Sequence, residues 1–167
     1  RFLDKGISTP KPLLKIDSEP FISHVINCVN FEKANFYFLI REEHLRENNF
    51  DDIFKKKKIK YKIIPIYKDT EGAACTVLLG TKEMDRNLPL VIKDCDQVIN
   101  WSQKNFLEFV NRRKNDGILV TVPTKNPGFS YVELLDDMST VSRTKEKEVV
   151  SSFGNTGCYY FNKTFEY

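Results

Sequence analysis

The sequence has few features of a secreted or membrane protein. Its four cysteines show no C-x-x-C spacing, which argues against a disulfide or zinc framework and is typical of reduced thiols. No apolar run approaches the length of a membrane span, and the N-terminus has no signal-peptide hydrophobic region. We therefore expect a soluble, cytoplasmic protein that does not contact membranes.

The chain also lacks a strong excess of charge of either sign. Lys and Arg number 26 and Asp and Glu number 23, so the net charge of +3 is too small to indicate a nucleic-acid-binding protein. The one dense basic run, residues 55–58, is explained by a solvated helix end more readily than by an RNA-binding patch. We expect no nucleic-acid partner.

Internal repeats are absent, and so are low-complexity tracts beyond that lysine run. A chain of 167 residues with 41% hydrophobic content is long enough for one domain with a sizeable core and too short to suggest two. The sequence therefore predicts a single domain over residues 1–167.

Apolar patterns predict strands that alternate with helices. The predicted strands cover residues 35–40, 59–66, 88–92 and 118–122, with Pro65 ending the second. The predicted helices are one capped by Ser18, a surface helix over residues 41–54, one that opens at Gly72 and one that begins near Trp101. This alternation is typical of βαβ units and a parallel sheet.

The pattern changes after residues 127–128. Residues 130–135 and 138–143 predict an antiparallel hairpin that turns at Asp136-Asp137, and residues 158–161 predict a buried strand entered through a glycine-containing segment. The predicted fold class is α/β, with a mainly parallel central sheet, helices on both faces and an added antiparallel hairpin.

Two aspartates follow the predicted central strand. In open α/β sheets, ligands lie beyond the carboxyl ends of the strands, where a carboxylate can hold Mg²⁺ against a phosphate. Asp94 and Asp96 occupy this position. The alternative is that both only cap the following helix, and the local sequence leaves this choice open.

Lys11 and Gly72 each allow two interpretations. Prolines on either side of Lys11 restrict the backbone and suit a fixed contact to an anion, but a rigid surface loop has the same pattern. Gly72 with its following alanines would let a ligand approach a helix start, and small residues equally let a helix pack closely on a sheet.

Several segments, in order along the chain, resemble motifs of the sugar nucleotidyltransferases, or nucleotide-sugar pyrophosphorylases. These are Arg1-Phe2, which resembles the end of a Gly-rich G-x-G-x-R-F loop, Thr9-Pro10-Lys11-Pro12-Leu13, Glu71-Gly72-Ala73-Ala74, Asp96-Gln97, Ser130-Tyr131-Val132, Glu146-Lys147 and residues 155–161. The resemblance covers nearly the whole chain and implies a Rossmann-like GT-A nucleotidyltransferase fold. It also implies a domain incomplete at both ends, with its first strand and its second metal-binding acid outside the sequence.

The resemblance implies that a nucleoside triphosphate is coupled to a sugar phosphate or another small phosphorylated acceptor, with release of pyrophosphate. Arg1 and Lys11 would be catalytic, and Asp96, or alternatively Asp94, would bind Mg²⁺. The implied nucleotide contacts are Glu71, Gly72 and Ala73, and the implied acceptor contacts are Tyr131, Glu146, Lys147, Asn155 and Gly157. The product would be an activated precursor for capsule or lipopolysaccharide synthesis. Homo-oligomerisation is left open.

Two other functions fit parts of the same pattern. A non-catalytic relative used for ligand binding or regulation would keep the fold without the complete motif set, although it would have no need of a metal-binding acid. A GT-A glycosyltransferase would use Asp94-Cys95-Asp96 as a D-x-D motif. The Thr-Pro-Lys-Pro-Leu segment favours the nucleotidyltransferase.

Overall fold

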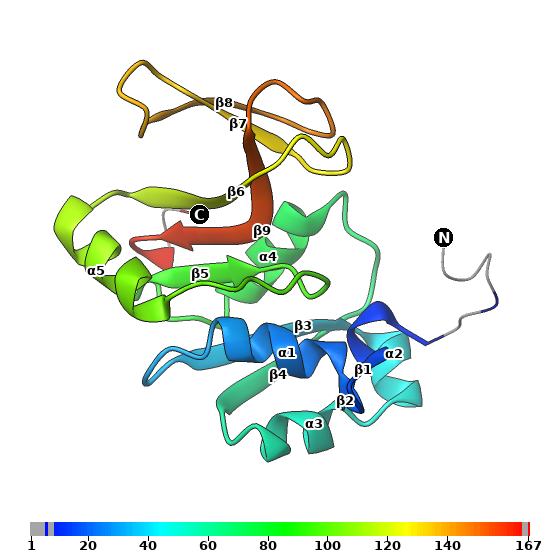
Figure 1. Cartoon of the computed structure of the whole chain (residues 1–167). Helices are drawn as coiled ribbons and strands as arrows, with labels where there is room; N and C mark the ends of the chain where they lie inside the picture. Colours follow the sequence, from blue (N-terminus) through cyan, green and yellow to red (C-terminus); the bar gives the residue numbers. More distant parts are fainter. Residues whose placement is uncertain (1–5, 7–8, 165–166) are drawn as a thin grey trace.

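The computed structural model describes residues 6, 9–164 and 167, in which helices flank strands that pair in three groups (Figure 1). The strands are β1 (Lys15–Ile16), β2 (Glu19–Pro20), β3 (Asn35–Arg41), β4 (Lys60–Ile66), β5 (Leu90–Lys93), β6 (Gly117–Pro123), β7 (Tyr131–Leu134), β8 (Val141–Lys145) and β9 (Phe153–Phe161). The helices are the 3-10 helix η2 (Lys11–Leu13) and α1 (Phe21–Cys28), α2 (Glu42–Glu47), α3 (Phe50–Lys56), α4 (Ala73–Thr81) and α5 (Gln103–Arg113). None of these helices is long and apolar enough to cross a bilayer.

Strands β3 and β4 form a parallel pair with helices on both faces. Their register runs from Asn35 opposite Lys60 to Arg41 opposite Ile66. One face carries the aromatic and aliphatic side chains that pack against α1 and α3. On the other face, α4 approaches β3 so closely that a Cβ at Gly80 would lie 2.8 Å from the Leu39 side chain. Helices on both faces of parallel strands were predicted, and this pair confirms them.

Phe54 stands at the centre of the core between α1, α3, β3 and β4. Its side chain is 0% exposed, and its ring stacks on Phe38 with a centroid distance of 3.7 Å. We expect Phe54→Ala to lower the free energy of unfolding by about 3–5 kcal/mol, because it removes a large buried ring and leaves a cavity. Urea unfolding of the full-length protein measures this loss. Phe109→Ala is the matched control, because Phe109 is 39% exposed on α5; equal losses in the two variants would contradict the assigned core.

The larger sheet is organised around β9, which pairs antiparallel with both β5 and β6. Strands β5 and β6 therefore run in the same direction, joined through α5, with β9 lying between them (Figure 1). The βαβ unit predicted from the sequence is present, but its two strands pair through β9. This insertion is not visible in the order of the elements, because β9 comes from the end of the chain.

The predicted antiparallel hairpin is confirmed in β7 and β8. Its return strand starts at Val141, three residues later than predicted, because Asp137 holds the turn. The Asp137 carboxylate accepts hydrogen bonds from the backbone N–H groups of Ser139 and Thr140, at 2.8 and 2.7 Å. The side-chain and backbone donors of Thr140 and the backbone N–H of Ser139 lower the pKa of Asp137 to about 2.

Two details of the predicted helices are wrong. Ser18 does not cap α1, because it lies in the turn between β1 and β2 with φ +68° and the helix begins after Pro20. The segment 41–54 is not one surface helix: it breaks into α2 and α3, and Asn49 caps α3 by accepting a hydrogen bond from Asp52 N. Buried Phe54 anchors α3 to the core.

Pro65 does not end its strand. It lies inside β4 opposite Ile40. Within the described residues β4 pairs with β3 alone, so the missing N–H of Pro65 does not interrupt a second ladder.

Candidate functional site

Lys11 and Asp96 meet in space although 85 residues separate them. Lys11 opens η2 between Pro10 and Pro12, and the turn is closed by a hydrogen bond from Leu13 N to Pro10 O of 2.8 Å. Asp96 follows the carboxyl end of β5. Lys11 Nζ lies 3.3 Å from Asp96 Oδ2, and the two side chains are 53% and 42% exposed. An ammonium on a restrained backbone turn and a carboxylate are thus presented together to solvent at the end of a strand.

The helix-capping alternative for the two aspartates is wrong. Helix α5 begins at Gln103, and its N-cap is Ser102, whose side chain accepts a hydrogen bond from Asn105 N. Neither aspartate caps α5, so their positions need another explanation.

Asp94 contacts a different part of the chain from Asp96. Its backbone N–H extends the ladder between β5 and β9 by donating to Gly157 O at 2.8 Å. Its side chain lies over the Cα of Gly157: a Cβ at that position would be 2.1 Å from Asp94 Oδ2. Gly157 also has φ +62°, a conformation that side chains disfavour. Glycine is therefore required at position 157 by both backbone conformation and space.

A bulge in β9 shapes the segment that contains Gly157. Leu119 of β6 is paired with Tyr159 and Thr121 with Asn155, so three residues of β9 lie opposite Val120 alone. Such bulges re-aim a strand and are frequent beside active sites.

Side chains of the bulge fix its shape. Asn155 Oδ1 accepts a hydrogen bond from Gly157 N at 2.9 Å, and Asn155 Nδ2 donates to the hydroxyl of Tyr159 at 3.2 Å. Thr156 Oγ1 donates to Val120 O at 2.7 Å. Two predicted acceptor residues, Asn155 and Gly157, thus belong to one rigid turn that faces Asp94.

Lys93 is a residue of this site that the sequence analysis missed. Its Nζ donates to Asp94 O at 3.2 Å and to Thr156 O at 3.1 Å, which ties the end of β5 to the bulge. Burial lowers the pKa of Lys93, and burial raises the pKa of Asp94. A lysine that follows three apolar residues of a buried strand was the signal that could have identified it.

The other predicted acceptor residues lie in two settings. Tyr131 is 0% exposed, and its hydroxyl donates to Asn126 O at 2.8 Å, so its side chain supports the base of the hairpin. Glu146 and Lys147 follow β8, are both exposed, and pair with each other at 3.2 Å. The roles predicted for these three residues stay predictions. Arg1 lies outside the described residues.

The segment Glu71-Gly72-Ala73 leads into α4 and is exposed. Gly72 is the N-cap with an extended φ of 174°, and a Cβ there would meet nothing within 4 Å. The close-packing explanation therefore applies to Gly80 of α4 and not to Gly72. The backbone in front of α4 is open to a ligand, and Thr70 Oγ1 donates to Gly72 O at 3.0 Å to hold the turn.

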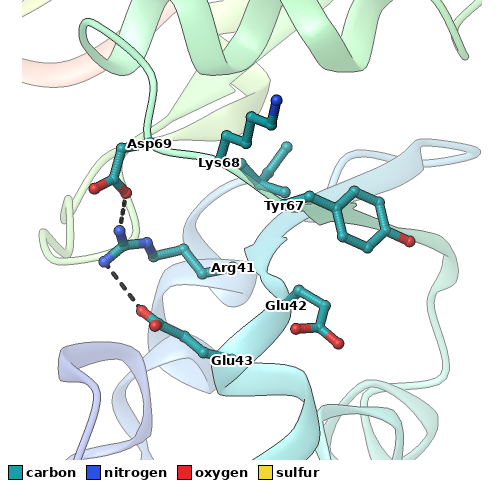
Figure 2. Close-up of a pocket in the computed structure, with 7 residues that line it drawn as sticks. Arg41, Glu42, Glu43, Tyr67, Lys68 and Asp69 are labelled. Atoms are coloured by element: carbon teal, nitrogen blue, oxygen red, sulfur yellow. Dashed lines mark hydrogen bonds and ion pairs between the residues drawn. The ribbon is translucent and has the colours of Figure 1, made fainter.

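A pocket of about 120 Å³ lies at the carboxyl ends of β3 and β4 (Figure 2). It is lined by Arg41, Glu42, Glu43, Ile66, Tyr67, Lys68 and Asp69. The Arg41 guanidinium pairs with Asp69 and, at 3.1 Å, with Glu43 Oε1. The sequence analysis missed this pocket, although the ends of two predicted parallel strands could have indicated it. One of its two lining segments, residues 66–69, lies just before residues 71–73 in the chain.

Comparison with known proteins assigns the fold. The profile of the family described as Nucleotidyl transferase matches residues 6–166. Similar solved structures include the nucleoside-diphosphate-sugar pyrophosphorylase from Vibrio cholerae, with a TM-score of 0.72 and 23% identity over 98% of this chain and 69% of that chain. HddC from Yersinia pseudotuberculosis has a TM-score of 0.74 and 17% identity over 98% of this chain and 73% of that one. UDP-glucose pyrophosphorylase has a TM-score of 0.73 and 14% identity over 99% and 74%.

Among curated proteins, none matches the sequence. At these identities the structural likeness shows the fold alone, and it confirms the Rossmann-like class that the motifs implied.

Proposed function

Because the chain belongs to the nucleotidyl transferase family, we propose that it couples a nucleoside triphosphate to a sugar phosphate or another small phosphorylated acceptor. In this proposal the protein is a cytoplasmic enzyme, and residues 1–167 form one nucleotidyltransferase domain. An acceptor phosphate oxygen forms a bond to the α-phosphorus, the bond from the α-phosphorus to the oxygen that bridges it to the β-phosphorus breaks, and pyrophosphate leaves. The observation that carries this proposal is the pair formed by Lys11 and Asp96, whose charges meet 3.3 Å apart at a strand end.

The proposed work of the protein is alignment and charge neutralisation, because phosphoryl-type transfer asks little covalent chemistry of side chains. Lys11 would turn from Asp96 to the α-phosphate and hold it near in-line geometry with the acceptor. Arg1 would contact the β- and γ-phosphates. The open backbone at Gly72 and Ala73 would contact the base beside Glu71, and the bulge of β9 would contact the acceptor.

The residues present fit a magnesium ion. Mg²⁺ is usually bound by one or two carboxylates together with waters and substrate phosphates, so it does not need a cage of protein ligands. No group of three or more metal-binding side chains occurs in the described part of the chain, and Asp96 offers an exposed carboxylate beside Lys11. Asp96 would hold the ion, which when bound would neutralise charge on the triphosphate.

We further propose that the product is an activated precursor for a surface polysaccharide, such as capsule or lipopolysaccharide. The support is the order of the acceptor-side motifs, which resembles that of enzymes that activate sugars.

Pyrophosphate release from the full-length protein tests the proposed function. Each nucleoside triphosphate is paired with hexose 1-phosphates, heptose phosphates and phosphocholine, with Mg²⁺ or with EDTA. We expect Mg²⁺-dependent release with one base and one acceptor class. Nucleotide binding without release from any pair would favour the non-catalytic relative, and sugar transfer from a nucleotide-sugar would favour the D-x-D glycosyltransferase.

A further inference from the structure

The Asp94 carboxylate is half-buried, yet no described residue donates a hydrogen bond to it or forms an ion pair with it. None of the buried side-chain polar atoms of the described residues lacks a partner, so the carboxylate oxygens of Asp94 remain open to solvent. A carboxylate that takes no donor from its described neighbours can accept hydrogen bonds from a ligand that displaces this water. The side chain has a defined place, because its atoms lie over the Cα of Gly157.

The contacts of Asp94 given by the structure are to the bulge of β9. Asp94 N bonds to Gly157 O, and Lys93 connects Asp94 O to Thr156 O. Asp96, two residues later, pairs instead with Lys11. The two carboxylates therefore serve different parts of the site, with Asp96 beside the catalytic lysine and Asp94 on the acceptor turn.

The geometry points to Asp94 as a specificity-determining residue that accepts hydrogen bonds from the hydroxyl groups of a sugar phosphate, and not as a metal ligand. This inference rests on the proposed function. Lys93 ties the backbone of Asp94 to the bulge, because its Nζ donates to Asp94 O and to Thr156 O.

The chemistry of the carboxylate selects the class of acceptor. An ionised carboxylate only accepts hydrogen bonds, so its ligand must carry donors. Sugar hydroxyls are donors, whereas the quaternary ammonium of phosphocholine has no N–H and is usually bound by aromatic faces. The site therefore favours a hydroxyl-rich acceptor.

Calorimetry on the full-length protein tests the inference with glucose 1-phosphate, mannose 1-phosphate and phosphocholine as probes. We expect Asp94→Ala to weaken binding of the preferred sugar phosphate by about 10- to 100-fold, the loss expected when a hydrogen bond to a charged group is removed. Asp94→Asn should lose less, because its amide oxygen still accepts a hydrogen bond from a hydroxyl. The control Asp116→Asn removes an exposed carboxylate from the turn before β6.

Binding of Mn²⁺ in the presence of nucleotide, followed by electron paramagnetic resonance, separates the acceptor role from a metal role. We expect Mn²⁺ affinity to change less than about twofold in Asp94→Asn. This variant keeps the shape of the side chain, so it also serves if Asp94→Ala does not fold. A large loss of Mn²⁺ affinity with sugar phosphate binding unchanged would overturn the inference. Tighter binding of phosphocholine than of either sugar phosphate would also overturn the inference, as would equal losses of sugar phosphate affinity in Asp94→Ala and the control Asp116→Asn.

The inference and the proposed function fail in different ways. If the wild-type protein binds sugar phosphates through Asp94 but releases no pyrophosphate, the proposed enzyme activity is wrong and the binding role of Asp94 is retained. If the wild-type protein releases pyrophosphate and Asp94→Ala retains its affinity for the sugar phosphate, the role of Asp94 is wrong and the proposed enzyme activity is retained.

Discussion

Asp96→Asn is expected to lower Mg²⁺-dependent pyrophosphate release by the full-length protein to the level seen without enzyme. The substitution keeps the shape of the side chain but removes the charge that would hold Mg²⁺ beside Lys11. Folding should change little, because an exposed ion pair contributes only about 0–1 kcal/mol to stability. Steady-state release assays over a range of Mg²⁺ concentrations, paired with thermal melts, measure both effects.

Asp94→Asn provides the internal comparison for this prediction. It should weaken release less than Asp96→Asn, because Asp94 lies over Gly157 and not beside Lys11. Asp116→Asn again controls for the loss of one surface carboxylate. Full pyrophosphate release by Asp96→Asn together with no release by Asp94→Asn would assign the metal-binding role to Asp94 in place of Asp96.

The spacing of apolar residues predicted the elements that bury one regular apolar face. The apolar stripe of α1 and the apolar run of β3 each bury one face, and both lie where periodicity placed them. The break at Asn48 and Asn49 was not predicted, because two polar residues inside a charged stretch give no periodic signal. It depends on the burial of Phe54 against β3 and β4, which is a tertiary effect.

The pairing of β9 between β5 and β6 could not be predicted from the sequence. Ladder partners are fixed by the assembled sheet, and the motif Asn155-Thr156-Gly157 shows its bulge only when β6 is in place. The same is true of Lys93, whose carbonyl partner Thr156 is 63 residues away. The resemblance to a family predicted Lys11 and Asp96 as parts of one site, and the structure brings them together, but local physics alone left both with structural alternatives.

Lys11→Ala is expected to lower turnover by about two or more powers of ten. The prolines on either side restrict the backbone that carries Lys11, and loss of one preorganised electrostatic donor typically costs about 10²–10³-fold in turnover. The free energy of unfolding should change by no more than about 0.5 kcal/mol, as for most exposed side chains. Lys15→Ala is the matched control, because it removes an exposed lysine four residues later, from β1.

Two further variants distinguish a phosphate contact from a contact to Asp96 alone. Lys11→Arg should not restore turnover, since a planar guanidinium does not replace a compact ammonium in a tight phosphate site. The double variant Lys11→Ala with Asp96→Asn should be no slower than the worse single variant, because both residues would act on the same triphosphate and their losses would not add. Unchanged kinetics in Lys11→Ala would leave the loop a rigid surface feature, and the pair with Asp96 would then favour a binding module over an enzyme.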